Sequence, residues 1–79
     1  MDKAVLDLLR SLPYVLELPS KHVWFDFDEE ADVLYVTFER PQEATDSELT
    51  DDDVILRYRG QQLVGVTILN ARKRIASRT

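Results

Sequence analysis

The segment Val33–Phe38 alternates between two sets of side chains, and both sets are largely apolar. Successive side chains of a β-strand point to opposite faces of the sheet. The two sets are Leu34, Val36 and Phe38 on one face, and Val33, Tyr35 and Thr37 on the other. A strand with water on one side needs only one apolar set. We therefore expect this segment to be a central strand that is covered on both faces.

Three further segments have the same period of two and predict strands of one sheet. The predicted strands are His22–Phe27, Val33–Phe38, Val54–Arg59 and Leu63–Leu69. Asp28–Asp32 and Gly60–Gln62 are turns in this scheme, and Arg40-Pro41 ends the second strand because proline donates no ladder hydrogen bond. The polar stretch Gln42–Asp53 is a connection with a short edge segment around Ser47–Leu49. Gly65 leaves room for a bulge or a close neighbour.

Helical patterns flank the strands. Asp2 caps an amphipathic helix whose apolar residues Val5, Leu8, Leu9 and Leu12 follow helical spacing. Pro13 disfavours helical geometry at the residue before it, so we expect the helix to stop there. Tyr14–Leu18 fits a short extended piece and a further helical turn equally well. Asn70 is the expected cap of a short basic turn, Ala71–Ile75.

Together these segments predict an α+β fold: a four-stranded antiparallel β-meander, with the N-terminal amphipathic helix packed on one face and a short C-terminal helical turn. The 79 residues form one domain (1–79) in this scheme. Its parts are an N-terminal helical extension, 1–21, the β-meander core, 22–70, and a basic tail, 71–79.

One short helix covers only one face of such a sheet, and a chain of this length commonly gains its missing burial by self-association. The sequence therefore predicts a homodimer. The residues left for a second copy to cover, and hence the predicted self-association face, are Val33, Tyr35, Ile55, Leu63 and Leu69.

Charge is uneven along the chain, which carries a net charge of −5. Between Asp26 and Asp53 there are twelve acidic residues and one basic residue, Arg40, so this part favours a basic protein partner over a phosphate backbone. The chain has no cysteine, which excludes thiol nucleophiles and disulfides. Its apolar runs are far shorter than a membrane span, and we expect a cytoplasmic protein with no membrane partner.

Catalytic chemistry has few candidates in this sequence. His22 is the single histidine and lies near Ser20, without the glycine-flanked turn that exposes a nucleophilic serine. A lone histidine before a strand is usually a surface residue. The sequence therefore predicts a non-enzymatic protein with no catalytic residue and no cofactor.

Acidic clusters raise the question of a metal. An EF-hand loop counted from Asp26 would need glycine at its sixth position and glutamate at its twelfth, where this chain has Ala31 and Thr37. The carboxylates of Asp28, Asp32 and Asp51–Asp53 are expected to be solvated turn residues. No metal site is predicted.

Nucleic-acid binding is the alternative function, and it requires a concentrated basic stripe. If the basic tail folds back over the third predicted strand, one patch results. Its residues are Arg57, Arg59, Arg72, Lys73 and Arg74, and Arg78 extends the tail beyond them. The net negative charge makes nucleic acid a less favoured partner than protein.

The run Asp28–Val36, DEEADVLYV, resembles the D-x-E-A-D-x-L-Y-I signature of a small prokaryotic family, domain of unknown function 2283. Ser47–Ala71, with SELTDDDVILRY, LVGVTIL and NA, resembles the acidic connection and final hairpin of the same family, and the likeness covers about Trp24–Lys73. Arg57 and Arg59 stand where members usually carry acidic residues, and Asn70 where aspartate is common.

The resemblance implies a fold without an assigned activity or catalytic residues. Some members are suspected of pairing with small toxin-like neighbours. It therefore implies an antitoxin-like role, in which the acidic side of this chain meets a small basic protein.

Overall fold

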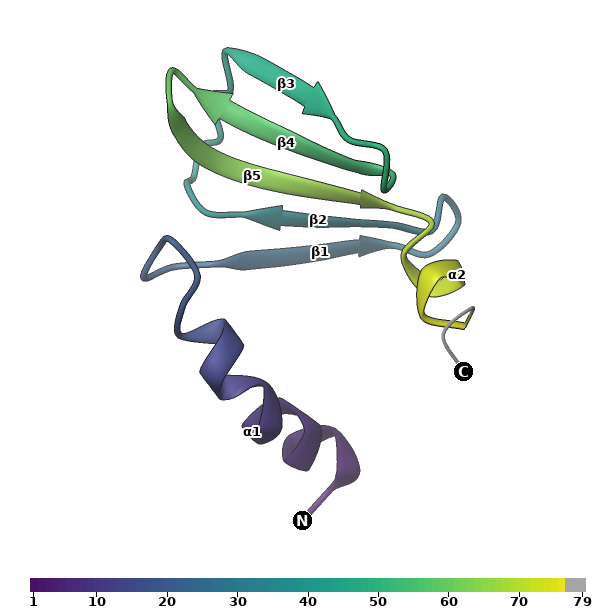
Figure 1. Ribbon diagram of the computed structural model, residues 1–79. Helices are drawn as coiled ribbons and strands as arrows, with labels where there is room; N and C mark the ends of the chain where they lie inside the picture. Colours follow the sequence, from purple (N-terminus) through teal and green to yellow (C-terminus); the bar gives the residue numbers. More distant parts are fainter. Residues whose placement is uncertain (77–79) are drawn as a thin grey trace.

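In the computed structural model, which describes residues 1–76, the chain forms two helices and a five-stranded antiparallel sheet (Figure 1). The elements are α1 (Lys3–Val15), β1 (Trp24–Asp28), β2 (Val33–Thr37), β3 (Asp46–Leu49), β4 (Val54–Arg59), β5 (Gln62–Leu69) and α2 (Ala71–Ala76). The α+β class, the antiparallel sheet, the N-terminal helix and the short C-terminal helix are confirmed.

The strands lie in the order β1-β2-β5-β4-β3. Two meander-like runs, β1–β2 and β3–β4–β5, are joined where β2 pairs with β5. The predicted number of four strands is wrong, because the short edge segment expected around Ser47–Leu49 forms a full fifth strand, β3, at the edge of the sheet. The strand β3 has the sequence DSEL, which contains one apolar residue and therefore no alternating apolar pattern. All four of its residues are exposed. Pairing with β4 makes it a strand, whereas its own pattern does not.

The register sorts the side chains onto two faces, as strand alternation requires. We call the first the phenylalanine face; it carries Phe25, Phe27, Leu34, Val36, Val54, Leu56, Val66 and Ile68. We call the second the tyrosine face; it carries Trp24, Asp26, Val33, Tyr35, Thr37, Ile55, Arg57, Gly65, Thr67 and Leu69. β2 is an interior strand with apolar residues on both faces, as its sequence predicted.

A bulge in β5 changes the expected position of Leu63. Arg57 lies opposite Gly65 while Tyr58 lies opposite Leu63, so Val64 is the extra residue on β5. Val64 is fully buried. Strict alternation put Leu63 in the row of the predicted self-association face. That placement is wrong, because one inserted residue returns Leu63 to the face of its partner Tyr58.

The connection between β2 and β3 crosses the tyrosine face at one end of the sheet. Gln42 Nε2 donates to the carbonyl oxygen of Val64 at 3.3 Å. The Arg40 guanidinium lies 5.4 Å from the centre of the Trp24 ring. A Cβ on Gly65 would overlap the side-chain amide of Gln42. Glycine at position 65 therefore permits this close approach, which the sequence predicted as one of two roles for this residue.

The helix α1 begins where the sequence predicted and ends later. The Asp2 carboxylate accepts from the Ala4 backbone N–H at 3.1 Å, which caps the first turn. The helix continues through Pro13, so the predicted stop there is wrong. Proline removes one N–H donor, but the next turn still closes, with the Leu16 N–H donating to the Leu12 carbonyl at 2.9 Å. Of the two alternatives for Tyr14–Leu18, the further helical turn is the one observed.

The helix does not pack on the sheet. It leads away from the β1 edge of the sheet (Figure 1), and none of its residues is buried. The predicted packing of α1 on one sheet face is therefore wrong for this single chain. The segment after the helix holds it in this direction, because the Ser20 hydroxyl donates to the Phe38 carbonyl at 3.0 Å.

We expect Gly65→Ala to lower the free energy of unfolding by about 1–2 kcal/mol, because the added methyl crowds Gln42 and lies 3.2 Å from the Val36 carbonyl oxygen. Chemical denaturation measures this. In a Gln42→Ala background the same substitution should cost less, because the amide group is gone. An equal cost in both backgrounds would contradict the contact.

Candidate functional site

The residues considered for catalysis have structural roles. His22 stacks on Trp24 with ring centres 6.0 Å apart. The Ser20 oxygen accepts from the His22 backbone N–H at 3.2 Å while its hydroxyl donates to Phe38. The pair therefore fastens the segment between α1 and β1 to the sheet. Within residues 1–76, histidine and carboxylate side chains form no group of three suited to hold a metal ion.

The first acidic loop, residues 28–32, caps the C-terminal helix α2, although the capping residue lies 40 positions earlier in the sequence. The Asp28 carboxylate accepts from the Ala31 N–H at 3.1 Å and shapes the turn. The Asp32 carboxylate accepts from the backbone N–H groups of Arg72, at 2.9 Å, and Lys73, at 3.4 Å. A carboxylate at a helix N-terminus satisfies free N–H groups and favours the helix. Asp32 thus fixes α2 to the β1–β2 turn.

The second acidic loop, residues 50–53, holds the same segment from the other side. The Asp53 carbonyl accepts from the Leu69 N–H at 2.9 Å, and its carboxylate accepts from the Asn70 side-chain amide at 3.3 Å. Arg74 Nη1 donates to the Asp52 carbonyl at 2.8 Å. The predicted cap role of Asn70 is therefore corrected: its carbonyl accepts the first helical bond, but the Asp32 side chain does the capping.

We call this arrangement of residues 28–32, 50–53 and 69–74 the α2 corner. It concentrates acidic side chains from two hairpins at one end of the sheet. Arg72 partly offsets them, since its guanidinium lies 3.7 Å from the Glu29 carboxylate and 4.9 Å from the centre of the Phe27 ring. Both groups of that ion pair are exposed, so the pair contributes little to stability.

The structure separates the predicted basic patch into two groups. Arg57 and Arg59 lie on β4, opposite Gly65 and Gln62, at the far end of β5 from α2. Arg72, Lys73 and Arg74 belong to α2. Arg57 donates to Thr67 and Ser47, at 3.4 and 3.5 Å, and Arg59 pairs with Glu39. The basic turn does not fold back over β4, so these side chains form no single stripe. Arg78 lies outside the described residues.

The predicted self-association residues differ in exposure. Val33 is buried, Ile55 and Leu69 are half-buried, and Tyr35 is 40% exposed. Thr67, at the centre of the same face, is buried. The tyrosine face therefore lacks the large exposed apolar surface that its sequence suggested.

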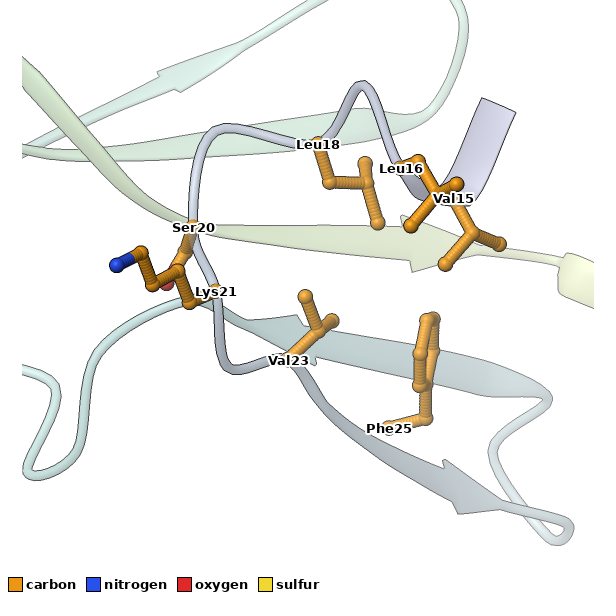
Figure 2. Close-up of a pocket in the computed structure, with 7 residues that line it drawn as sticks. All are labelled: Val15, Leu16, Leu18, Ser20, Lys21, Val23 and Phe25. Atoms are coloured by element: carbon orange, nitrogen blue, oxygen red, sulfur yellow. The ribbon is translucent and has the colours of Figure 1, made fainter. Parts of the chain in front are cut away.

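The phenylalanine face is the more open one, and sequence reasoning missed this because it assigned α1 as its cover. Phe25 is 58% exposed there. A hollow of about 570 Å³ lies between this ring and the end of α1, and Figure 2 shows the side chains that line it. Its lining residues are Val15, Leu16, Leu18, Ser20, Lys21, Val23 and Phe25. A second hollow, of about 270 Å³, lies beside α2 over Leu34, Val54, Val66 and Ile68.

The whole chain is more exposed than a compact monomer of its mass. Its accessible surface is 6399 Å², whereas a folded monomer of 9.2 kDa exposes about 4,900 Å². Its Cα radius of gyration is 13.8 Å, against about 12 Å expected for this length. Within residues 1–76 the buried apolar residues are Val33, Val36, Phe38 and Val64. This small core leaves much apolar surface uncovered.

Comparison with known proteins gives one family match. The model of a family described as protein of unknown function (DUF2283) matches residues 24–72, which span the sheet and the start of α2. No curated protein and no solved structure matches the chain. In the described part of the chain, neither helix has the length and apolarity that crossing a membrane demands.

We expect Asp32→Ala to lower the free energy of unfolding by about 1–2 kcal/mol, since it removes the acceptor for two N–H groups of α2. Asp32→Asn should cost less, because asparagine keeps one acceptor and tolerates the left-handed backbone (φ 57°). Urea denaturation measures both. The exposed Asp51→Ala is the matched control and should change stability by less than about 0.5 kcal/mol. Equal losses at positions 32 and 51 would refute the capping role.

Proposed function

We propose that this chain, which belongs to the DUF2283 family of proteins of unknown function, is a non-enzymatic, cytoplasmic protein-interaction module. In this proposal it acts as a homodimer whose acidic side binds a small basic protein, in the manner of an antitoxin. The family description assigns no activity, so the proposal depends on the surfaces of this chain.

The observation that carries the proposal is the uncovered apolar surface. Soluble monomers rarely expose contiguous apolar patches of several hundred Å² without a binding role. Here both the α1 stripe and the phenylalanine face are open, on a chain that exposes about 1,500 Å² more than a compact monomer would. By contrast, the polar groups Ser20, Asp28 and Asp32 hydrogen-bond to backbone, which favours structural roles over chemistry.

Charge decides the chemistry of the proposed partner. The chain carries a net charge of −5, and acidic side chains from two loops gather at the α2 corner. Arg59 and Arg72 are paired with the chain's own acidic residues. Complementary charge steers association and suppresses wrong partners, so a basic protein surface fits this end of the molecule.

A capture experiment from the native cell tests this. The tagged chain should retain a small basic protein in stoichiometric amount, and raised salt should weaken the capture. The variant Asp51→Asn/Asp52→Asn removes two exposed charges at the α2 corner without changing side-chain size. We expect it to weaken binding about tenfold, which corresponds to 1.4 kcal/mol.

The matched control is Glu17→Gln/Glu43→Gln, which removes the same charge from exposed positions outside the α2 corner. It should bind like the unmodified chain. Capture of no basic protein, or equal weakening by both double variants, would count against an acidic binding side at this corner.

A further inference from the structure

We propose that α1 of one copy packs its apolar stripe across the phenylalanine face of a second copy, and that the exchange is reciprocal in a two-fold dimer. The inference rests on the homodimer of the proposed function and goes further by naming the two surfaces that meet. It moves the interface away from the tyrosine face that the sequence favoured.

The helix needs an apolar partner. Its stripe residues Val5, Leu8, Leu9 and Leu12 are 42%, 59%, 47% and 39% exposed, although their spacing is that of a packed helix. Isolated helices shorter than about 12–15 residues are only marginally stable in water, and packing of the apolar face supplies most helical stability in proteins. α1 has 13 residues. Its amphipathic sequence is therefore explained by a surface that this chain does not itself offer.

The chain's own sheet is not that surface. After α1, backbone bonds continue the turn from Leu16 to Leu18, with the Leu18 N–H donating to the Val15 carbonyl at 3.2 Å. Ser20 then fastens the segment to Phe38. The intervening Pro19 restricts the backbone further. These constraints direct α1 past the β1 edge (Figure 1). None of its residues is buried, so its stripe is available to a neighbouring molecule.

The phenylalanine face fits such a helix in size and character. Thirteen residues make a helix about 20 Å long, and five strands spaced about 4.8 Å apart make a sheet of similar width. The face is apolar and hollowed at both ends, beside Phe25 and beside α2. The residues that line the first hollow come from the end of α1, from the connection 16–23 and from β1 (Figure 2). An incoming helix would thus also touch the last turn of the resident α1.

The exposed area agrees with a stable dimer. The excess of about 1,500 Å² per chain includes polar as well as apolar surface, so it sets an upper limit of about 3,000 Å² on the interface area of such a dimer. Obligate homodimers bury about 2,000–5,000 Å², whereas weak contacts bury less than about 1,200 Å². A reciprocal exchange also satisfies two-fold symmetry, because each copy supplies one helix and one face.

Light scattering with size-exclusion chromatography tests the dimer. The unmodified chain should have twice the 9.2 kDa mass of one copy. Leu9→Asp places a charge in the stripe. It should weaken self-association at least a hundredfold, so that the variant is a monomer. Tyr14→Asp, on the opposite side of α1, should remain dimeric. Circular dichroism shows that the sheet is retained in each variant. A monomeric unmodified chain, or a dimeric Leu9→Asp variant, would overturn the proposal.

Disulfide pairing tests the geometry, because the chain contains no cysteine of its own. A Leu9→Cys chain is mixed with chains carrying Phe25→Cys, Leu34→Cys or Val66→Cys, and each mixture is oxidised. At least one mixture should form a disulfide between different chains in high yield. Tyr35→Cys, on the tyrosine face, is the control and should not. If no mixture exceeds the control, or if Leu9→Cys pairs only with itself, the helix lies elsewhere.

The outcomes separate this inference from the proposed function. A dimer without the expected disulfides overturns the helix exchange alone. A monomeric chain overturns the homodimer as well. The capture of a basic partner, with its charge variants, decides the remainder of the proposed function independently of both.

Discussion

The pairing of β2 with β5 is the interaction on which the rest of the structure depends. It runs from Val33 opposite Leu69 to Thr37 opposite Gly65, and it joins two runs of strands that otherwise share no ladder. At one end it brings Asp32 next to α2, which allows the capping bonds. At the other it places Gly65 beneath the β2–β3 connection, where Gln42 crosses. The contact of Asp32 with α2 and the cover on the tyrosine face both follow from this register, and the pairing of β4 with β5 adds the second acidic loop to the α2 corner.

Much of this sheet was predictable because its interior strands alternate. The pattern identified Val33–Thr37 and Val54–Arg59, and the turn at Gly60 followed from a residue that adopts positive φ at no steric cost. The edge strand Asp46–Leu49 was harder, because its partner supplies the pairing and water meets both of its faces. The strand order was equally hidden, since alternation says which faces are apolar but does not identify the neighbouring strand.

The candidate surfaces were predicted less well, for three physical reasons. A helical stripe shows that α1 needs an apolar partner but does not say which one. A bulge shifts the register by one residue, which moved Leu63 between faces without any break in its apolar pattern. Basic residues that the sequence suggests as one patch can also lie far apart in space. Arg59 pairs with Glu39 at one end of the sheet, while Arg72 pairs with Glu29 at the other. The face on which a residue lies, and its distance from other charged residues, become known only from the pairing register of the strands.

Two unsatisfied surfaces in one chain have a common explanation when each fits the other. α1 contains no buried residue, and the phenylalanine face is left hollow at both ends. Either surface alone would destabilise a 79-residue fold whose core is small. The family match begins at residue 24, after α1, so the sheet and the α2 corner carry the shared pattern. In the proposed dimer, this face is covered by the N-terminal segment of the second copy, which combines a helix about as long as the sheet is wide with a linker that Ser20 fixes to the sheet.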